Sequence, residues 1–273
     1  MAGKTSRLRQ VGTMKIGFRT AGFHKRPIAE ALQVLGGLGY DGVELCLEHP
    51  DCRPEALTEA DAARLAEGCA AAGLEVASVS YHADFEGPEQ RRRNTVRGLG
   101  LVPAFGADVF IINGRRTEPD EAAAWRDLHE ALELLLPRAR DLGVRIAIEP
   151  EPGLAVSDSA EMRRLLDAEP GGALAVNLDV GHAFLTDPDV CESIRMLGSD
   201  IAHTHVEGMA SGVHQHLLPG EGDLDLIAVC RTLAEIEYRG YCTLDLFNIA
   251  DNPADWATSA LQAMRRIIAQ ARE

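Results

Sequence analysis

The sequence predicts a single (β/α)8 barrel, and three observations support that prediction. First, one unit recurs along the chain: an amphipathic helix, a glycine, a short β-branched run and a polar loop. Short apolar strands that alternate with helices form parallel sheets covered on the outside. Second, the 273 residues suit a barrel, which typically needs about 250. Third, eight of the nine histidines follow predicted strands, which in a barrel places them at the end where such folds carry their chemistry.

The elements follow in chain order from the joints between helices and strands. Glycine just past a helix end adopts the left-handed conformation that turns the chain into a strand. Five such joints lead into strands at 39–45, 73–79, 106–112, 143–149 and 240–245, and apolar runs at 15–18, 174–179 and 201–205 complete the eight. Helices are expected near 27–38, 55–72, 88–104, 118–141, 158–168, 187–197, 224–238 and 253–270. A doubly wound open sheet is the alternative, but no G-x-G-x-x-G motif opens a helix.

Residues 14–273 are expected to form one catalytic barrel domain, because no linker or break in composition divides them. Residues 1–13 are basic and polar, lack the apolar stretch of a secretory signal, and are expected to form a flexible tail. No apolar run approaches the roughly 20 residues of a membrane helix. The six cysteines show no C-x-x-C spacing. We therefore expect a cytoplasmic protein with reduced cysteines and no membrane contact. A homo-oligomer is compatible with the sequence, which does not fix the number of subunits.

The net charge of −15 argues against nucleic acid as a partner, because phosphate repels an acidic protein. Positive charge gathers at the N-terminal end, where seven basic residues precede the first acidic residue, Glu30. We interpret this cluster as a solvated terminus. Its members are Lys4, Arg7, Arg9, Lys15, Arg19, Lys25 and Arg26.

Four later strands each end in a residue that binds metals or handles protons. These are Glu149, Asp179, His205 and Asp245. Because the carboxyl ends of barrel strands meet at one rim, we expect the four side chains to surround one divalent ion. Three carboxylates and one imidazole form a hard, mostly oxygen set that favours Mn²⁺, Mg²⁺ or Co²⁺, with Zn²⁺ possible.

Other residues near these strand ends are expected to line the same mouth. Gly181 would allow a tight turn that brings His182 over the site, whereas Asp179 as a helix N-cap is the competing interpretation. His203 points to the same side of its strand as His205 and either fills the layer beneath or contacts substrate. Glu151 is interpreted as solvated. The candidate substrate-binding residues are Glu44, His82, Arg115, His182, His214 and His216, the last two in an expected loop.

The motifs that contain these residues resemble, in their order and spacing, those of the xylose isomerase-like barrel superfamily over about residues 14–270. The resemblance rests on Gly-Tyr-Asp-Gly-Val-Glu44, Ile-Glu149-Pro, Leu-Asp179-Val-Gly-His182, His203-Thr-His205 and His216-Leu-Leu-Pro-Gly-Glu-Gly. That superfamily contains sugar and sugar-phosphate isomerases and epimerases, inosose-type dehydratases, and zinc endonucleases for abasic DNA sites. The resemblance implies a single divalent ion held by Glu149, Asp179, His205 and Asp245.

The chain departs from the family pattern at two positions. Isomerases of the family usually carry glutamate where Asp245 stands, and the shorter side chain puts its proton-transfer role in doubt. The DNA-repair branch has a histidine after its fourth strand, where this chain has Asn113. A full three-zinc cluster would lack a ligand there, although His182, His214 and His216 resemble that branch's third-metal group.

The expected function is a metal-dependent isomerase or epimerase that acts on a small keto-sugar or polyol through an enediolate. Glu149 would remove the proton α to the carbonyl, and Asp245 or His182 would return it. A dehydratase or other lyase is the closest alternative, because the same enediolate can expel a β-hydroxyl. A metal-dependent phosphodiesterase or endonuclease and a non-catalytic sugar-binding barrel are the remaining alternatives.

Overall fold

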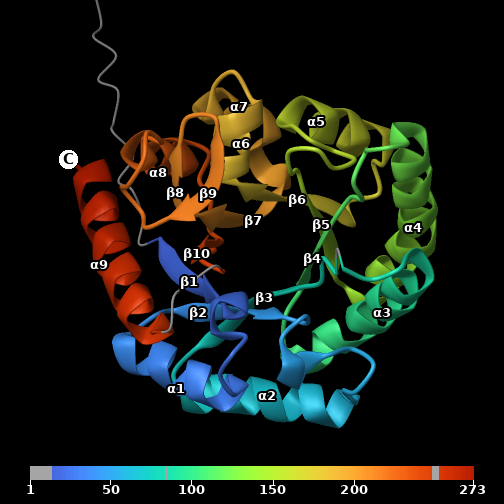
Figure 1. The fold of residues 1–273 in the computed structure, drawn as a ribbon, viewed down its shortest axis with the longest axis horizontal. Helices are drawn as coiled ribbons and strands as arrows, with labels where there is room; N and C mark the ends of the chain where they lie inside the picture. Colours follow the sequence, from blue (N-terminus) through green and yellow to red (C-terminus); the bar gives the residue numbers. More distant parts are fainter. Residues whose placement is uncertain (1–13, 84, 248–251) are drawn as a thin grey trace, which may run out of the picture.

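The computed structural model describes residues 14–83, 85–247 and 252–273, so the tail predicted at 1–13 lies outside the described residues. Eight parallel strands close into a barrel in the order β1-β10-β7-β6-β5-β4-β3-β2, and helices form a ring around it (Figure 1). The strands are β1 Lys15–Arg19, β2 Gly42–Cys46, β3 Glu75–Ser80, β4 Val109–Asn113, β5 Arg145–Glu149, β6 Leu174–Asp179, β7 Ile201–Val206 and β10 Tyr241–Leu244. The predicted (β/α)8 barrel is confirmed.

The outer ring contains the eight predicted helices, most of which begin later than expected, and one short helix at Val180–Thr186 that was not predicted. The helices are α1 Ile28–Leu38, α2 Glu59–Ala71, α3 Pro88–Leu101, α4 Glu121–Leu142, α5 Ser159–Ala168, α6 Val180–Thr186, α7 Val190–Leu197, α8 Leu226–Glu235 and α9 Pro253–Ala271. Short 3₁₀ turns lie at Thr20–Phe23, Pro50–Cys52, Val102–Phe105 and Gly198–Asp200. The shifts follow capping: an aspartate side chain caps each of α4 to α8, and Thr58 with Asp61 forms a capping box on α2.

The glycine joints behave as expected at four of five positions. Gly39, Gly73, Gly106 and Gly143 all have positive φ, between 67° and 87°. Gly240 does not have a positive φ; at the end of α8 it is Glu237 that adopts the left-handed conformation, with φ of 60°. The helix-to-strand turn therefore occurs three residues earlier there than the glycine suggests.

Two elements near the mouth of the barrel differ from the sequence prediction. Residues 214–216, expected in a loop, belong to β9 (Val213–Leu217), which pairs antiparallel with β8 (Gly208–Ala210). His182, expected in a turn, lies in the short helix α6. Both elements are inserted after barrel strands, where (β/α)8 folds place their functional loops (Figure 1).

The main apolar core lies between the sheet and the helices, because alternate residues of each strand face outward. Ile146 and Ile148 of β5 belong to that core, whereas Glu149 projects to the other side, into the barrel. All six cysteines are unpaired, as expected. No described helix combines the length and the apolar character that crossing a membrane requires.

Candidate metal centre and active site

The carboxyl ends of four strands bring together the four predicted metal-binding residues. Glu149 and Asp179 are the last residues of β5 and β6, His205 lies near the end of β7, and Asp245 directly follows β10. The register of the strands places these residues at one level of the barrel. In the sheet, His205 of β7 pairs with Asp179 of β6 on one side and with Thr243 of β10 on the other. All four residues are buried, each 2% exposed or less. They lie inside the barrel at its carboxyl-terminal end.

Their donor atoms converge on the Nδ1 atom of His205. This atom lies 3.3 Å from Glu149 Oε2, 3.9 Å from Asp179 Oδ2 and 3.8 Å from Asp245 Oδ2. Asp179 Oδ2 receives no hydrogen bond from the described residues, although it is buried. A buried carboxylate oxygen without a donor is costly unless a positive charge faces it. The donor set therefore fits one divalent ion. In this structure Asn177 Nδ2 lies 3.1 Å from His205 Nδ1, and a bound ion would replace Asn177 as the partner of that nitrogen.

Glu44 lies behind His205 rather than in the mouth of the barrel. His205 Nε2 donates to Glu44 Oε2 at 2.8 Å, which leaves the Nδ1 lone pair of the neutral ring directed at the proposed ion. A carboxylate behind a metal-binding histidine orients the ring and makes it a stronger ligand. Burial opposes ionisation of Glu44, but His205, His203 and Arg19 outweigh it and hold its pKa well below the usual range.

His203 occupies the layer beneath the site, one of the two positions expected for it. Its Nε2 atom lies 3.3 Å from Glu44 Oε2 and 3.3 Å from Ser78 Oγ, and its ring stacks on Tyr241. Burial is the largest influence on its pKa and lowers it. His203 thus supports Glu44, and its ring meets the ring of His205 edge to face, with 5.8 Å between the centroids.

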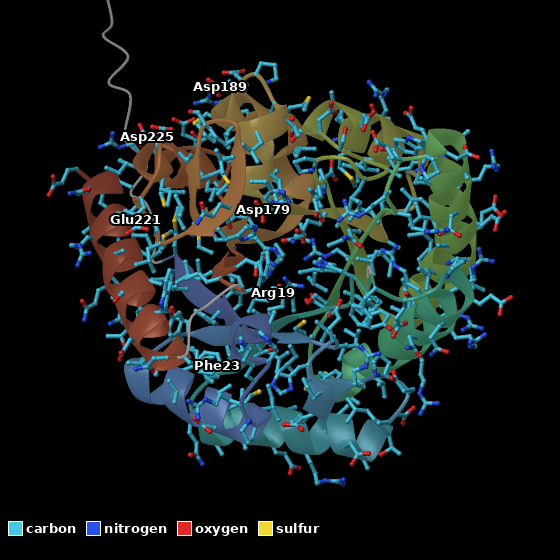
Figure 2. The ribbon with its side chains drawn as sticks, viewed as in Figure 1. Arg19, Phe23, Asp179, Asp189, Glu221 and Asp225 are labelled. Carbon is cyan, nitrogen blue, oxygen red and sulfur yellow. The ribbon has the colours of Figure 1, made fainter. Side chains whose placement is uncertain are left out.

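Arg19 corrects the interpretation of the N-terminal basic cluster as a solvated terminus. It is the last residue of β1 and only 7% exposed, and Figure 2 shows it, with Asp179, inside the ring of helices. Its guanidinium donates to both oxygens of Asp245, at 3.2 and 3.3 Å, and its Nε lies 3.0 Å from Glu44 Oε1. Burial raises the pKa of Asp245, but Arg19 and His205 outweigh it and keep the pKa below its usual value.

His82 bridges Arg19 and Glu149. Arg19 Nη2 donates to His82 Nδ1 at 3.0 Å, so the proton of the neutral ring is on Nε2, which lies 3.3 Å from Glu149 Oε2. The loop that carries His82 is held by Glu48, whose carboxylate accepts the backbone N–H groups of His82 and Ala83. Burial disfavours the charged ring, yet Glu149 raises the pKa of His82 above its usual value.

Three histidines border the opposite side of the site. His182 Nδ1 donates to the carbonyl of Pro150 at 3.2 Å, and its Nε2 lies within hydrogen-bond distance of His214 Nε2, at 2.9 Å. His216 Nδ1 donates to the carbonyl of Asp245 at 2.7 Å. Asp179 is the N-cap of α6, because its Oδ1 accepts the His182 N–H at 2.8 Å, and its Oδ2 lies 3.9 Å from His205 Nδ1 on the side of the converging donors.

A cavity of about 420 Å³ opens above these residues. Its lining includes Arg19, Glu48, His82, Glu149, Glu151, His182, His214, His216 and Asp245, with Phe85 and Phe247 among the other lining residues. Glu151 therefore lies in the mouth and is not a solvated residue, and it accepts a hydrogen bond from Asn113 at 3.2 Å. Burial raises the pKa of Glu151.

Arg115 lies away from this cavity. It lines a separate cavity with residues of α3 and α4, such as Arg92 and Leu135, and its guanidinium lies 3.9 Å from Asp127. The loop after β4 thus directs this side chain outward.

Glu207 is a buried carboxylate beside the site that the sequence interpretation missed. It is fully buried, and burial and the nearby Asp179 raise its pKa well above the usual range. The signal was present, since His203, His205 and Glu207 alternate along one strand and its extension, and alternate residues share a face.

The comparisons with known proteins agree with this architecture. A family model described as xylose isomerase-like TIM barrel matches residues 32–267. Fructoselysine 3-epimerase of Escherichia coli O157:H7 is 24% identical, over 93% of this chain and 98% of its own. 3-Dehydroshikimate dehydratase of Pseudomonas aeruginosa is 26% identical, over 88% of this chain and 39% of its own.

Solved structures share the fold. The crystal structure of the IOLI protein with a bound zinc atom superposes with a TM-score of 0.78 at 18% identity, over 94% of this chain and 98% of that chain. With the closed eight-stranded barrel and the family match over most of its length, this chain belongs to the xylose isomerase-like TIM-barrel family.

Proposed function

We propose that this protein is a divalent-metal-dependent isomerase or epimerase of a small keto-sugar or polyol derivative. The observation that supports it is the convergence of Glu149, Asp179 and Asp245 on His205 Nδ1 at the floor of a cavity sized for a small molecule. A divalent ion in this set, with Mn²⁺, Mg²⁺ or Co²⁺ preferred and Zn²⁺ possible, would act as a Lewis acid on a substrate carbonyl. The epimerase and dehydratase names of the relatives support an enzyme of this chemical class.

Glu149 is the proposed base that removes the proton α to the carbonyl. Its Oε2 atom receives a hydrogen bond from Asn177 at 2.8 Å and lies near His82 and His205. Burial opposes its ionisation, but His205 and His82 lower the pKa of Glu149 well below the usual range. The carboxylate is therefore ionised and held in one orientation, as a positioned base requires.

His182 is the better-supported group for returning the proton. Asp245, the other candidate, accepts from Arg19 with both oxygens, which holds it as an anion. His182 lines the cavity and lies 3.6 Å from Glu149 Oε1. Burial lowers its pKa, but Asp179, Glu149 and Glu151 outweigh this and raise it. His82, His214 and His216 also line the cavity and are proposed to contact substrate hydroxyls.

A dehydratase is the second candidate, supported by the dehydratase among the relatives. Candidate keto-sugars incubated in D₂O with metal-loaded protein, and followed by NMR and mass spectrometry, separate the two reactions. Deuterium at the carbon next to the carbonyl, in a product of otherwise unchanged formula, indicates isomerisation. A product that has lost water indicates elimination.

Glu149→Gln should reduce turnover by about 10²–10⁴-fold, the usual contribution of a positioned acid or base. The matched control is Glu151→Gln, which removes a carboxylate of the same cavity without touching the converging donors. Near-normal turnover in Glu149→Gln, with its metal content unchanged, would reject Glu149 as the base.

A further inference from the structure

A permanent positive charge lies against the proposed metal centre. Arg19 ends β1, and the strand register sets it between two carboxylates. It pairs with Glu44 of β2 on one side, and on the other side Phe18 pairs with Leu244, which puts Arg19 level with Asp245. Figure 2 shows Arg19 inside the ring of helices. Because an arginine side chain does not lose its proton in a protein, this charge is fixed.

Arg19 contacts protein groups with all three nitrogens of its guanidinium group. Nη1 donates to both oxygens of Asp245, at 3.2 and 3.3 Å, and Nη2 donates to His82 Nδ1 at 3.0 Å. Nε lies 3.0 Å from Glu44 Oε1. Although Arg19 borders the cavity, its nitrogens are thus directed at protein groups and not at a substrate. Arg19 is therefore a positioning residue, which acts through its charge and through the groups that it holds.

Negative charge exceeds positive charge among the buried groups around Arg19. The carboxylates of Glu44, Glu149, Asp179 and Asp245 are all buried there, whereas Arg19 is the only buried arginine or lysine in the described part of the chain. Charges interact strongly in such a place, because a buried site screens them less than water does. An entering divalent ion is attracted by the carboxylates and repelled by Arg19.

Arg19 also competes with an ion for the electrons of Asp245. Both oxygens of Asp245 accept hydrogen bonds from Arg19, which makes this carboxylate a weaker ligand. An ion bound to a weaker ligand keeps more of its charge as a Lewis acid. The guanidinium group adds a second positive charge near the negative charge that forms on the substrate when Glu149 removes the α-proton.

Repulsion should outweigh the help that Arg19 gives by orienting Asp245. At the effective dielectric constant of buried sites, two unit charges about 4 Å apart change an equilibrium constant by about 10³-fold. The orientation of a metal ligand by its neighbours contributes about 10–100-fold. The net effect of Arg19 on ion binding is therefore unfavourable, in contrast to that of Glu44.

We propose that Arg19 lowers the affinity of the site for its divalent ion and stabilises the negative charge that forms on the substrate. The inference rests on the proposed function for both the ion and the enediolate. Because one charge causes both effects, one substitution should change both, in opposite directions: the ion is bound more tightly and the reaction becomes slower.

Arg19→Met tests the proposal, since methionine keeps an apolar chain in place and removes the charge. Ion-free protein is titrated with Mn²⁺ in competition with a chromophoric chelator. Turnover is then measured at saturating Mn²⁺ with a keto-sugar that wild-type protein converts. We expect Arg19→Met to bind Mn²⁺ about 10–100-fold more tightly than wild type and to turn over about 10–100-fold more slowly.

Two further variants separate charge from shape and position. Arg19→Lys keeps the charge without the planar fork of donors and should bind Mn²⁺ within about threefold of wild type. Arg53→Met is the matched control, because Arg53 is paired with Glu86, at 2.6 Å, and not with the converging donors. It should leave Mn²⁺ affinity unchanged.

Unchanged or weaker Mn²⁺ binding in Arg19→Met would overturn the proposal, and Arg19 would then be an ordinary orienting partner of Asp245. Tighter binding in Arg19→Lys as well would also overturn it, because the charge would not be the cause. If Arg19→Met does not fold, judged by circular dichroism, Arg19→Gln supplies the same comparison. Tighter binding with wild-type turnover would overturn the effect on the substrate charge.

The ion measurement also separates this proposal from the proposed function. Tighter Mn²⁺ binding in Arg19→Met, with no turnover of any sugar by wild-type protein, would leave the effect of Arg19 on the ion standing while the proposed function fails. Turnover of a keto-sugar by wild-type protein, with no gain in Mn²⁺ affinity in Arg19→Met, would reject the role of Arg19 and keep the proposed function.

Discussion

Replacing Glu44 by glutamine tests whether the carboxylate behind His205 strengthens the metal centre. Glu44 is completely buried and accepts the Nε2 proton of His205 at 2.8 Å. Glutamine keeps the shape and one acceptor oxygen but removes the charge. Partners of this kind typically contribute 10–100-fold to metal affinity, which corresponds to about 1.4–2.7 kcal/mol. We expect a loss of that size in Glu44→Gln.

The assay is competition for Zn²⁺ or Mn²⁺ with a chromophoric chelator, with both proteins shown to be folded by circular dichroism. It is performed at a pH above the raised pKa of His205, so that protons do not compete with the ion for its Nδ1 atom. Ser78→Ala is the matched control, because Ser78 donates to the same Glu44 oxygen at 3.0 Å without being a partner of His205. It should change the affinity less than Glu44→Gln does. An affinity of Glu44→Gln within twofold of wild type would refute the reasoning.

Three further predictions concern pH, packing and the loop after β4. Burial lowers the pKa of His205, but Glu44 and Glu149 outweigh it and raise the pKa well above its usual value. The stability that His205 lends to ion-free protein is therefore complete below its unfolded pKa of about 6.5 and is lost as the pH rises through the folded value. Ion affinity should correspondingly increase with pH over that window, and a flat profile in binding titrations would contradict this. Gly181→Ala should destabilise the fold by about 1–3 kcal/mol in thermal unfolding, because the added Cβ overlaps Glu207. Gly37→Ala, with open space around it, should not destabilise the fold. Equal stabilities of Gly181→Ala and wild type would refute the packing argument. Arg115→Gln should leave KM unchanged because Arg115 lines a different cavity. A several-fold increase in KM would instead indicate that Arg115 contacts the substrate.

The barrel was predictable from the sequence because its signals are local. Each helix-to-strand joint with a left-handed glycine, such as Gly39 or Gly143, lies within a few residues of the strand it introduces. Apolar strands followed by single polar residues also indicated where Glu149 and Asp179 would lie, since parallel strands share one carboxyl end. Helix starts were less accurate where the capping residue, such as Thr58 or Asp120, lies two or three residues inside the expected range.

The residues missed in the site depend on contacts between distant segments. Arg19 was grouped with a basic terminus by its neighbours in sequence, but Asp245, 226 residues away, holds it inside the barrel. Glu151 was interpreted as exposed because it begins a Pro-Gly loop, but in the structure it lines the cavity and accepts a hydrogen bond from Asn113. Glu207 belongs to an alternating series that continues beyond the expected end of its strand. The pairing of β8 with β9, by contrast, is local, because Ser211 and Gly212, which has a φ of 70°, join the two strands.

Anomalous diffraction from a crystal of the zinc-loaded protein tests the metal centre most directly. We predict a strong peak bonded to Glu149, Asp179, His205 Nδ1 and Asp245, with a zinc–nitrogen distance of about 2.0–2.1 Å. A peak held only by His182, His214 and His216, or no peak at saturating zinc, would contradict the account.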